Sequence, residues 1–167
     1  ARLLGEPEPL EAERKFLIGR FDPAALPPHA VAVDIVQNYL VSDPSVVERV
    51  RARGQKGHWA YTHTIKEPRG QGVSVERERR ISRGEYEGLL VRRDTGRMPI
   101  YKTRHCFAHA GHYCELDVFL GHRAGKVVLE IETAPEERSV SLPPYLDVVR
   151  EVTDELSFTN YALSGAA

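Results

Sequence analysis

The sequence predicts a mainly β domain of the α+β class, an antiparallel sheet of many strands that curls or closes, with a few helices packed outside it. Short segments of alternating polar and apolar residues follow one another along most of the 167-residue chain. This pattern is typical of strands with one buried face. Gly, Pro and Asp-Pro separate the segments, as in "SDPS", "RGQKG" and "EPRGQG". Because such short connections suit hairpins better than crossovers, we expect antiparallel pairing.

Eight segments have the residue pattern of strands. They are rich in β-branched and aromatic residues and most end at a turn signal. In chain order they are Leu10–Gly19, Ala30–Val41, Val46–Arg53, Trp59–Lys66, Ser74–Ile81, Ile100–Phe107, Tyr113–Leu120 and Lys126–Thr133. Residues 1–9 are expected to form a weakly ordered lead-in. With 41% hydrophobic residues, the chain 1–167 suits a single domain with one core.

Helix signals are sparse. A helix is expected at Arg83–Arg93, because Ser82 with Glu85 three residues later is a capping-box pattern. A short helix is expected over "APEERSV" (134–140). Another is expected over "YLDVVREVTDEL" (145–156) with Leu146 and Val149 facing inward, although the β-branched residues of "REVT" disfavour it.

The composition limits the classes of function. A formal net charge of -1 argues against bulk electrostatic attraction to nucleic acid or to a membrane surface. We find no apolar run of membrane-spanning length and no secretory leader. The two cysteines, Cys106 and Cys114, do not make a disulfide framework. A cytoplasmic protein is therefore expected.

Charged residues line one face of most of the expected strands. Because residues two apart in a strand point the same way, Glu11, Glu13 and Lys15 share a face. For any single strand the simplest explanation is a polar face in water. Here, however, whole strands are cationic and others anionic, which favours charged faces that point inward around a water-filled bore. The later sets are Arg49, Arg51 and Arg53; Thr62, Thr64 and Lys66; Glu76, Glu78 and Arg80; Lys102 and Arg104; Glu115 and Asp117; and Glu130 and Glu132.

Buried charges of this kind need compensation. A hard divalent cation such as Mg²⁺ takes oxygen ligands, commonly one or two carboxylates together with phosphate oxygens. A polyanion would be held by the Arg and Lys side chains, since Arg binds phosphate through two parallel hydrogen bonds. A metal ion and a phosphate chain together would neutralise both halves of the lining.

The segment "EAERK" resembles the E-x-E-x-K signature of the CYTH domain, also called the triphosphate tunnel metalloenzymes. In the same order, "QNYL", "RVRARG", "HTIK", "YKTRH", "ELDVFLG", "VLEIE" and "REVTDELSFTN" resemble motifs of its short, single-domain bacterial members. The resemblance implies a closed tunnel of eight antiparallel strands. It also implies an enzyme that acts on a small-molecule triphosphate with Mg²⁺ or Mn²⁺.

The resemblance also implies roles for individual residues. The metal-binding glutamates of the family match Glu11, Glu13, Glu130 and Glu132. Its phosphate-holding residues match Lys15, Arg49, Arg51, Lys66, Lys102 and Arg104, and its acidic tunnel positions, which orient cations or hold a second metal, match Glu76, Glu78, Glu115 and Asp117. In the catalytic hypothesis, Lys102 and Tyr39 stabilise the leaving group, while Glu13 orients the attacking water. The chain departs from the family at Ser74, where members often carry Arg, and at His105, where they commonly have Tyr.

An inorganic triphosphatase that cleaves tripolyphosphate is the first choice of function. The alternatives are a class IV-like adenylate cyclase, a thiamine or nucleoside triphosphatase, and a non-catalytic polyphosphate or nucleotide binder. The presence of Lys102 and the full set of carboxylates argue against the binder, which needs cations more than metal ligands. Trp59 is more simply explained by packing than as a platform for thiamine. A homodimer is left open.

The segment "HCFAHAGHYC" invites interpretation as a structural zinc site, because it holds three histidines and two cysteines. Its spacing is not that of a zinc finger. Strand alternation also places Cys106 and Cys114 on opposite faces. We therefore expect a hairpin here, without zinc.

Overall fold

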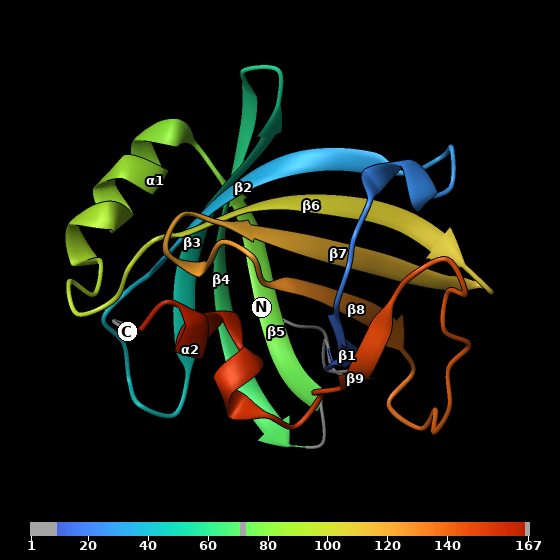
Figure 1. Cartoon of the computed structure of the whole chain (residues 1–167). Coiled ribbons are helices and arrows are strands. Elements are labelled where there is room, and N and C mark those ends of the chain that lie inside the picture. The colour runs from blue at the N-terminus through green and yellow to red at the C-terminus, as the bar shows by residue number, and fades with distance from the viewer. Residues whose placement is uncertain (1–9, 71–72, 166–167) are drawn as a thin grey trace.

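The computed structural model describes residues 10–70 and 73–165, without the side chains of Leu10 and Glu11. Its strands form one antiparallel sheet in the order β5-β4-β3-β2-β6-β7-β8-β1-β9 (Figure 1). In chain order the strands are β1 (Leu10–Ile18), β2 (Val31–Tyr39), β3 (Val47–Gln55), β4 (His58–Gly70), β5 (Val73–Ile81), β6 (Ile100–His109), β7 (His112–Leu120), β8 (Val127–Thr133) and β9 (Val148–Glu151). The eight expected strands are therefore confirmed, with ends that differ by a few residues.

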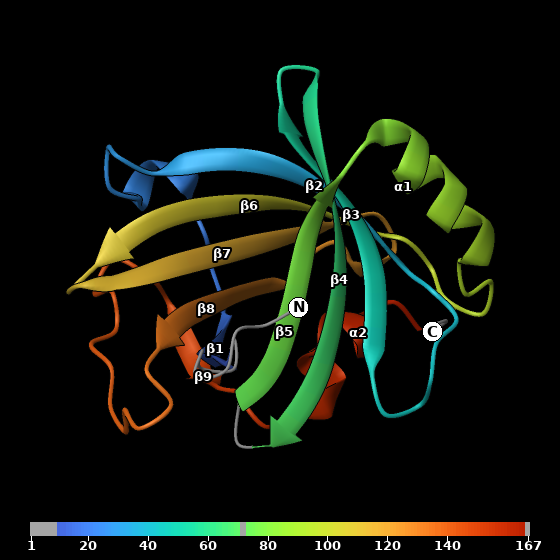
Figure 2. The same ribbon diagram turned by 180° about the vertical axis from the view of Figure 1, so that it is seen from behind.

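The sheet closes on itself through β1. The first residues of β1, from Leu10 to Ala12, pair with β5. Residues from Ala12 to Ile18 pair with β8 on the other side. Because β5 reaches only the start of this edge, β9 pairs with residues Phe16 to Ile18 of β1. The result is a closed barrel of eight antiparallel strands, with β3, β4 and β5 forming the wall that faces the viewer in Figure 2.

The larger apolar clusters lie outside the barrel. In β1, Phe16 and Ile18 belong to the main cluster, whereas Lys15, which precedes Phe16, lines the interior. The same alternation places Leu116 and Leu129 outward, next to Glu115 and Glu130. The segments before β2 and before β9 cover this cluster with Phe21, Leu26, Val140 and Tyr145.

A separate apolar cluster fills one end of the barrel interior. It contains Tyr39, Ile100, Phe119 and Val128, which share their strands with the charged residues. Leu163, from the short helix α2 (Asn160–Leu163), completes the cluster. The charged part of the interior is therefore bounded at one end by apolar side chains.

The expected helix after β5 is confirmed. Helix α1 (Arg83–Leu89) continues into a 3₁₀ turn (Leu90–Arg92), and the Ser82 hydroxyl accepts a 3.1 Å hydrogen bond from the backbone N–H of Glu85. Tyr86 packs against Val50, Ala52 and Ile81 on the outside of the barrel. Within the described residues, no helix is long and apolar enough to cross a membrane.

Two expected helices are wrong. Residues 134–140 form a turn instead, in which the Glu137 carboxylate accepts from the backbone N–H of Ala134 at 2.7 Å. Residues 145–156 contain β9 and a few turn residues. Leu146 is buried as expected, but Val149 is exposed. For residues 145–156 the physical reason is the unpaired edge of β1, which offers β-branched residues a strand partner.

Candidate active site

A cavity of about 500 Å³ occupies the charged part of the barrel interior. Each strand from β1 to β8 contributes to its wall. The charged lining residues are Glu13, Lys15, Arg49, Arg51, Arg53, Lys66, Glu76, Glu78, Arg104, Glu115, Glu130 and Glu132. The strands therefore turn their charged faces toward the cavity, and most of the sequence-predicted site residues meet there.

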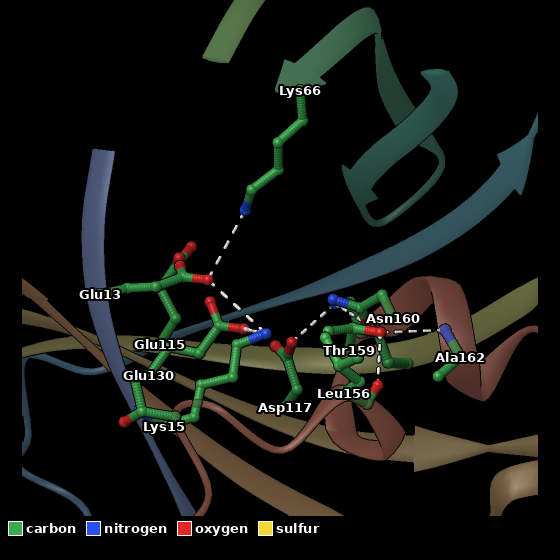
Figure 3. A network of polar contacts seen from close by, with 12 residues as sticks. Glu13, Lys15, Lys66, Glu115, Asp117, Glu130, Leu156, Thr159, Asn160 and Ala162 are labelled. Carbon is green, nitrogen blue, oxygen red and sulfur yellow. Dashed lines mark hydrogen bonds and ion pairs between the residues drawn. The ribbon is translucent and has the colours of Figure 1, made fainter. Parts of the chain in front are cut away.

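Lys15 lies between two of the predicted metal ligands (Figure 3). Its Nζ is 3.6 Å from Oε1 of Glu13 on the same strand and 3.6 Å from Oε1 of Glu130 on β8. Lys66 approaches from β4, with its Nζ 3.7 Å from the same oxygen of Glu13. Glu13 thus contacts cations from β1 and β4, and one of these, Lys15, also contacts Glu130.

The environments of these two carboxylates differ. Burial and the negative charge of Glu130 raise the pKa of Glu13 to about 7. Burial would also raise the pKa of Glu130, but the positive charges of Lys15 and Arg104 outweigh it and lower that pKa to about 2. Two close, buried carboxylates favour an additional positive charge between them.

The described residues offer a divalent cation a small number of carboxylate ligands. Among the described side chains, no three His, Cys, Asp or Glu residues converge closely enough to hold a metal ion. The side chain of Glu11 lies outside the described residues, and its backbone pairs with Ser74 of β5. Glu132 lines the cavity near its exposed part. Because Mg²⁺ commonly takes one or two carboxylates and completes its shell with water and phosphate oxygens, Glu13 and Glu130 suit such an ion.

Arg104 is held rigidly by two acidic residues. Its Nε and Nη2 donate to the two carboxylate oxygens of Asp117 at 2.8 and 2.9 Å, and its Nη1 donates to Glu115 at 2.6 Å. The cations Arg104 and Lys102 keep the pKa of Asp117 well below its usual range, although burial alone would raise it. Asp117 and Glu115 therefore orient a basic group.

Lys102 lies beneath the cavity wall rather than in it. Its side chain is fully buried, with the Nζ 2.7 Å from a carboxylate oxygen of Asp117 and 3.1 Å from Oδ1 of Asn160. Burial lowers the pKa of Lys102 to about 7, against the opposing effect of Asp117. Its ammonium contacts protein groups, whereas the catalytic hypothesis has it contact the leaving group.

The opposite wall carries Arg49 and two glutamates of β5. The Nη2 of Arg49 is 3.4 Å from Glu76, which also lies 3.9 Å from the Nζ of Lys66. Glu78 accepts a hydrogen bond from the hydroxyl of Thr64 at 3.1 Å. Of the buried side-chain nitrogens in the described part of the chain, the Nε of Arg49 is one that has no hydrogen-bond partner. A bound anion would supply the missing acceptor.

Sequence reasoning missed the contribution of the C-terminal segment. Leu156, Thr159, Asn160 and Tyr161 line the cavity, and the Thr159 hydroxyl caps α2 by accepting from the backbone N–H of Ala162 at 3.1 Å (Figure 3). The signal was present in "REVTDELSFTN", a motif whose residues carry no predicted role in the site. Arg53 and Tyr113 also line the cavity, although neither is a predicted site residue.

Neither of the two departures from the family motifs is among the residues that line the cavity. Ser74 is buried opposite Glu11, and the ring of His105 packs against Phe21 at 5.4 Å between centroids. Cys106 and Cys114 face opposite ways, as expected. Cys106 contacts Arg53, whereas Cys114 belongs to the outer apolar cluster.

Comparison with known proteins finds similar chains over nearly the whole length. The chain is 31% identical over 156 residues to the inorganic triphosphatase of Nitrosomonas europaea, covering 92% of this chain and 96% of that protein. It is 30% identical over 151 residues to the inorganic triphosphatase of Acetivibrio thermocellus, covering 90% of each. The crystal structure of the inorganic triphosphatase NE1496 matches with a TM-score of 0.63 at 30% identity, covering 94% of this chain and 95% of that one. No family model matches the chain.

Proposed function

Because the chain belongs to the family of inorganic triphosphatases, we propose that it hydrolyses the terminal phosphoanhydride of inorganic tripolyphosphate, or of a related triphosphate, inside the barrel. The observation that carries this proposal is the enclosed cavity, where cations from β1, β3, β4 and β6 face carboxylates from β1, β5, β7 and β8. A short chain of phosphates would match the cations, and the carboxylates would hold a metal ion whose shell phosphate oxygens could complete.

Mg²⁺ or Mn²⁺ is the proposed cofactor. Glu13 and Glu130 would hold it, with Glu132 and Glu11 as the further ligands that the family resemblance implies. When bound, such an ion neutralises phosphate oxygens and acts as a Lewis acid. The closeness of Glu13 and Glu130, with Lys15 in contact with both, supports this assignment.

The protein groups position the substrate and spread its charge. Arg104, fixed by two carboxylates, is a rigid donor, and Arg49 and Arg51 offer guanidinium groups from β3. Such preorganised cations stabilise the charge that develops on the transferred phosphoryl group. In this proposal Glu13 orients the attacking water and Tyr39 donates to the leaving phosphate, and both residues line the cavity. Lys102 lies beneath the wall, where it pairs with Asp117, which also holds Arg104.

A substrate panel tests the proposal. The purified protein is incubated with tripolyphosphate, ATP or thiamine triphosphate, with Mg²⁺ or Mn²⁺, and the products are identified by ion chromatography. Release of pyrophosphate and phosphate from tripolyphosphate, faster than any turnover of the other two substrates, is expected. Cyclic AMP from ATP would identify a cyclase instead. Tight binding of tripolyphosphate without turnover in either metal would identify a binder.

A further inference from the structure

Gln37 hydrogen-bonds two cavity-lining residues, Arg51 and Tyr39, without lining the cavity itself. It lies on β2 and is fully buried. Its Oε1 accepts hydrogen bonds from Nε and Nη2 of Arg51 at 3.0 and 2.7 Å, and its Nε2 donates to the hydroxyl of Tyr39 at 2.7 Å. The register enforces this geometry, because Gln37 lies directly opposite Arg51 in the sheet and Tyr39 follows two residues later on the same face.

The direction of each hydrogen bond follows from the chemistry of the three groups. A guanidinium has only donors, so the amide oxygen of Gln37 must face Arg51. The amide nitrogen, which only donates, must then face Tyr39. The phenol oxygen of Tyr39 therefore accepts this bond, and its own hydrogen stays available for a second partner. Tyr39 borders the cavity, where an anionic oxygen would be that partner.

Gln37 is a neutral partner for Arg51, so it does not cancel the positive charge of the guanidinium. Arg104 is bound by the carboxylates of Glu115 and Asp117, whereas the acceptor for Arg51 is a neutral amide. Burial, together with the charges of Arg49 and Arg104, lowers the pKa of Arg51 to about 9, so the guanidinium is still charged at neutral pH. Arg51 is thus oriented and remains able to attract an anion.

We propose that Gln37 is a positioning residue of the active site, which presents the guanidinium of Arg51 and directs the hydroxyl proton of Tyr39 toward the bound triphosphate. The inference rests on the proposed function and deepens it. The side chain lies behind Arg51 and Tyr39, and is not among the residues that line the cavity. It therefore acts on the substrate only through these two residues.

A double-mutant cycle on tripolyphosphate hydrolysis tests the inference. Gln37→Met keeps the length of the side chain and removes both hydrogen bonds. Tyr39→Phe removes the hydroxyl and should lower kcat about tenfold, the effect of one hydrogen bond in the transition state. Gln37→Met should lower kcat by about as much and also raise KM several-fold through Arg51. The combined variant should match the kcat of Gln37→Met within about twofold, because each single substitution already removes the directed hydrogen bond from Tyr39 to the substrate.

Effects on kcat that multiply to about 100-fold in the combined variant would overturn the inference, as would Gln37→Met with unchanged kcat and KM. Thr64→Val is the matched control, since Thr64 is also buried and hydrogen-bonds Glu78 on the other side of β3. Thr64→Val and Tyr39→Phe should act independently, so that the fold-loss of kcat in their combined variant equals the product of the two single losses.

A second variant keeps the inference testable if Gln37→Met does not fold. Gln37→Glu keeps an acceptor for Arg51, but its second oxygen can only accept, so Tyr39 must turn its proton away from the cavity. Tyr39→Phe should then change kcat by less than about twofold in the Gln37→Glu background. A further tenfold loss there would overturn the inference.

The same variants separate this inference from the proposed function. A wild-type chain that does not hydrolyse tripolyphosphate refutes the proposed function. In that case calorimetric titration of the same variants with tripolyphosphate tests the inference. Non-additive effects of Gln37→Met and Tyr39→Phe on the free energy of binding support it, and additive effects overturn it. A chain that does not bind tripolyphosphate overturns both.

Discussion

Lys15 on β1 and Glu130 on β8 lie directly opposite each other in the sheet, with 3.6 Å between the ammonium nitrogen and the carboxylate oxygen. Both side chains are buried inside the barrel rather than exposed on its surface. Burying such a pair costs desolvation energy, and the fold compensates with further charges around it. The pair therefore belongs to a site prepared for charged ligands.

Glu130→Gln should lower Mg²⁺-dependent turnover of tripolyphosphate at least about 100-fold, because a neutral amide of nearly equal size replaces the carboxylate that we propose as a metal ligand. Steady-state phosphate release measures the effect. Glu136→Gln, which changes an exposed glutamate after β8, is the matched control and should retain wild-type kcat. Full turnover in Glu130→Gln would show that this carboxylate holds no catalytic metal.

Arg49→Lys should raise KM for tripolyphosphate about tenfold with little change in kcat. The substitution keeps the charge but removes the planar fork, including the Nε that is buried without a protein partner. Initial rates over a range of substrate concentration give the two constants separately. Arg20→Lys, at an exposed arginine outside the cavity, is the control and should change neither. An unchanged KM in Arg49→Lys would remove Arg49 from the binding set.

Chelation of divalent cations should abolish turnover, and added Mg²⁺ or Mn²⁺ should restore it. The physical reason is that the carboxylates of Glu13 and Glu130 face each other across Lys15 and, without a metal ion, repel the phosphate chain. The measurement is phosphate release in excess EDTA, followed by titration with each metal. Undiminished hydrolysis in excess chelator would contradict the metal assignment.

Asp117 should make the fold sensitive to acid. Its pKa in the folded state lies below the value of 3.8 for the free side chain, since Arg104 and Lys102 stabilise its charge. The stabilisation is therefore fully present above that value and is lost as the pH falls through and below it. Asp117→Asn should lower the free energy of unfolding by about 3 kcal/mol near pH 7, because it breaks buried ion pairs.

Urea unfolding of both proteins between pH 7 and pH 3 checks this linkage. The gap in unfolding free energy between wild type and Asp117→Asn should shrink toward pH 3, because the unfolded wild-type carboxylate takes up a proton there while the folded one resists it. A gap that stays constant with pH would mean that Asp117 contributes through packing rather than through charge.

The charged faces of the strands could be predicted from alternation, but their direction could not. A period of two places Glu11, Glu13 and Lys15 on one face whether that face meets solvent or a cavity. The direction depends on closure of the sheet between β1 and β5, a pairing of residues more than sixty positions apart. The separation of cationic from anionic strands favoured an inward direction in a sheet that curls or closes, and the family resemblance made the closed tunnel of eight strands the expectation.

The wrong helix over residues 145–156 has a related cause. The residues of β9 read as a helix because their local pattern is ambiguous, and the unpaired edge of β1 decides in favour of a strand. The inward direction of the Lys102 side chain is predictable from alternation. Its depth depends on Asp117 of the neighbouring strand β7 and on Asn160 of the C-terminal segment. Gln37 is not predicted as a site residue because the site residues are predicted from their charge, and Gln37 is a neutral amide.

The most direct test of the proposed hydrolysis is a time course with tripolyphosphate followed by phosphorus NMR, with Mg²⁺, for the wild-type chain and Glu130→Gln side by side. Pyrophosphate and phosphate in equal amounts are expected from the wild type, and hardly any product from the variant. Intact tripolyphosphate after incubation of the wild type with either Mg²⁺ or Mn²⁺ would contradict the proposed activity.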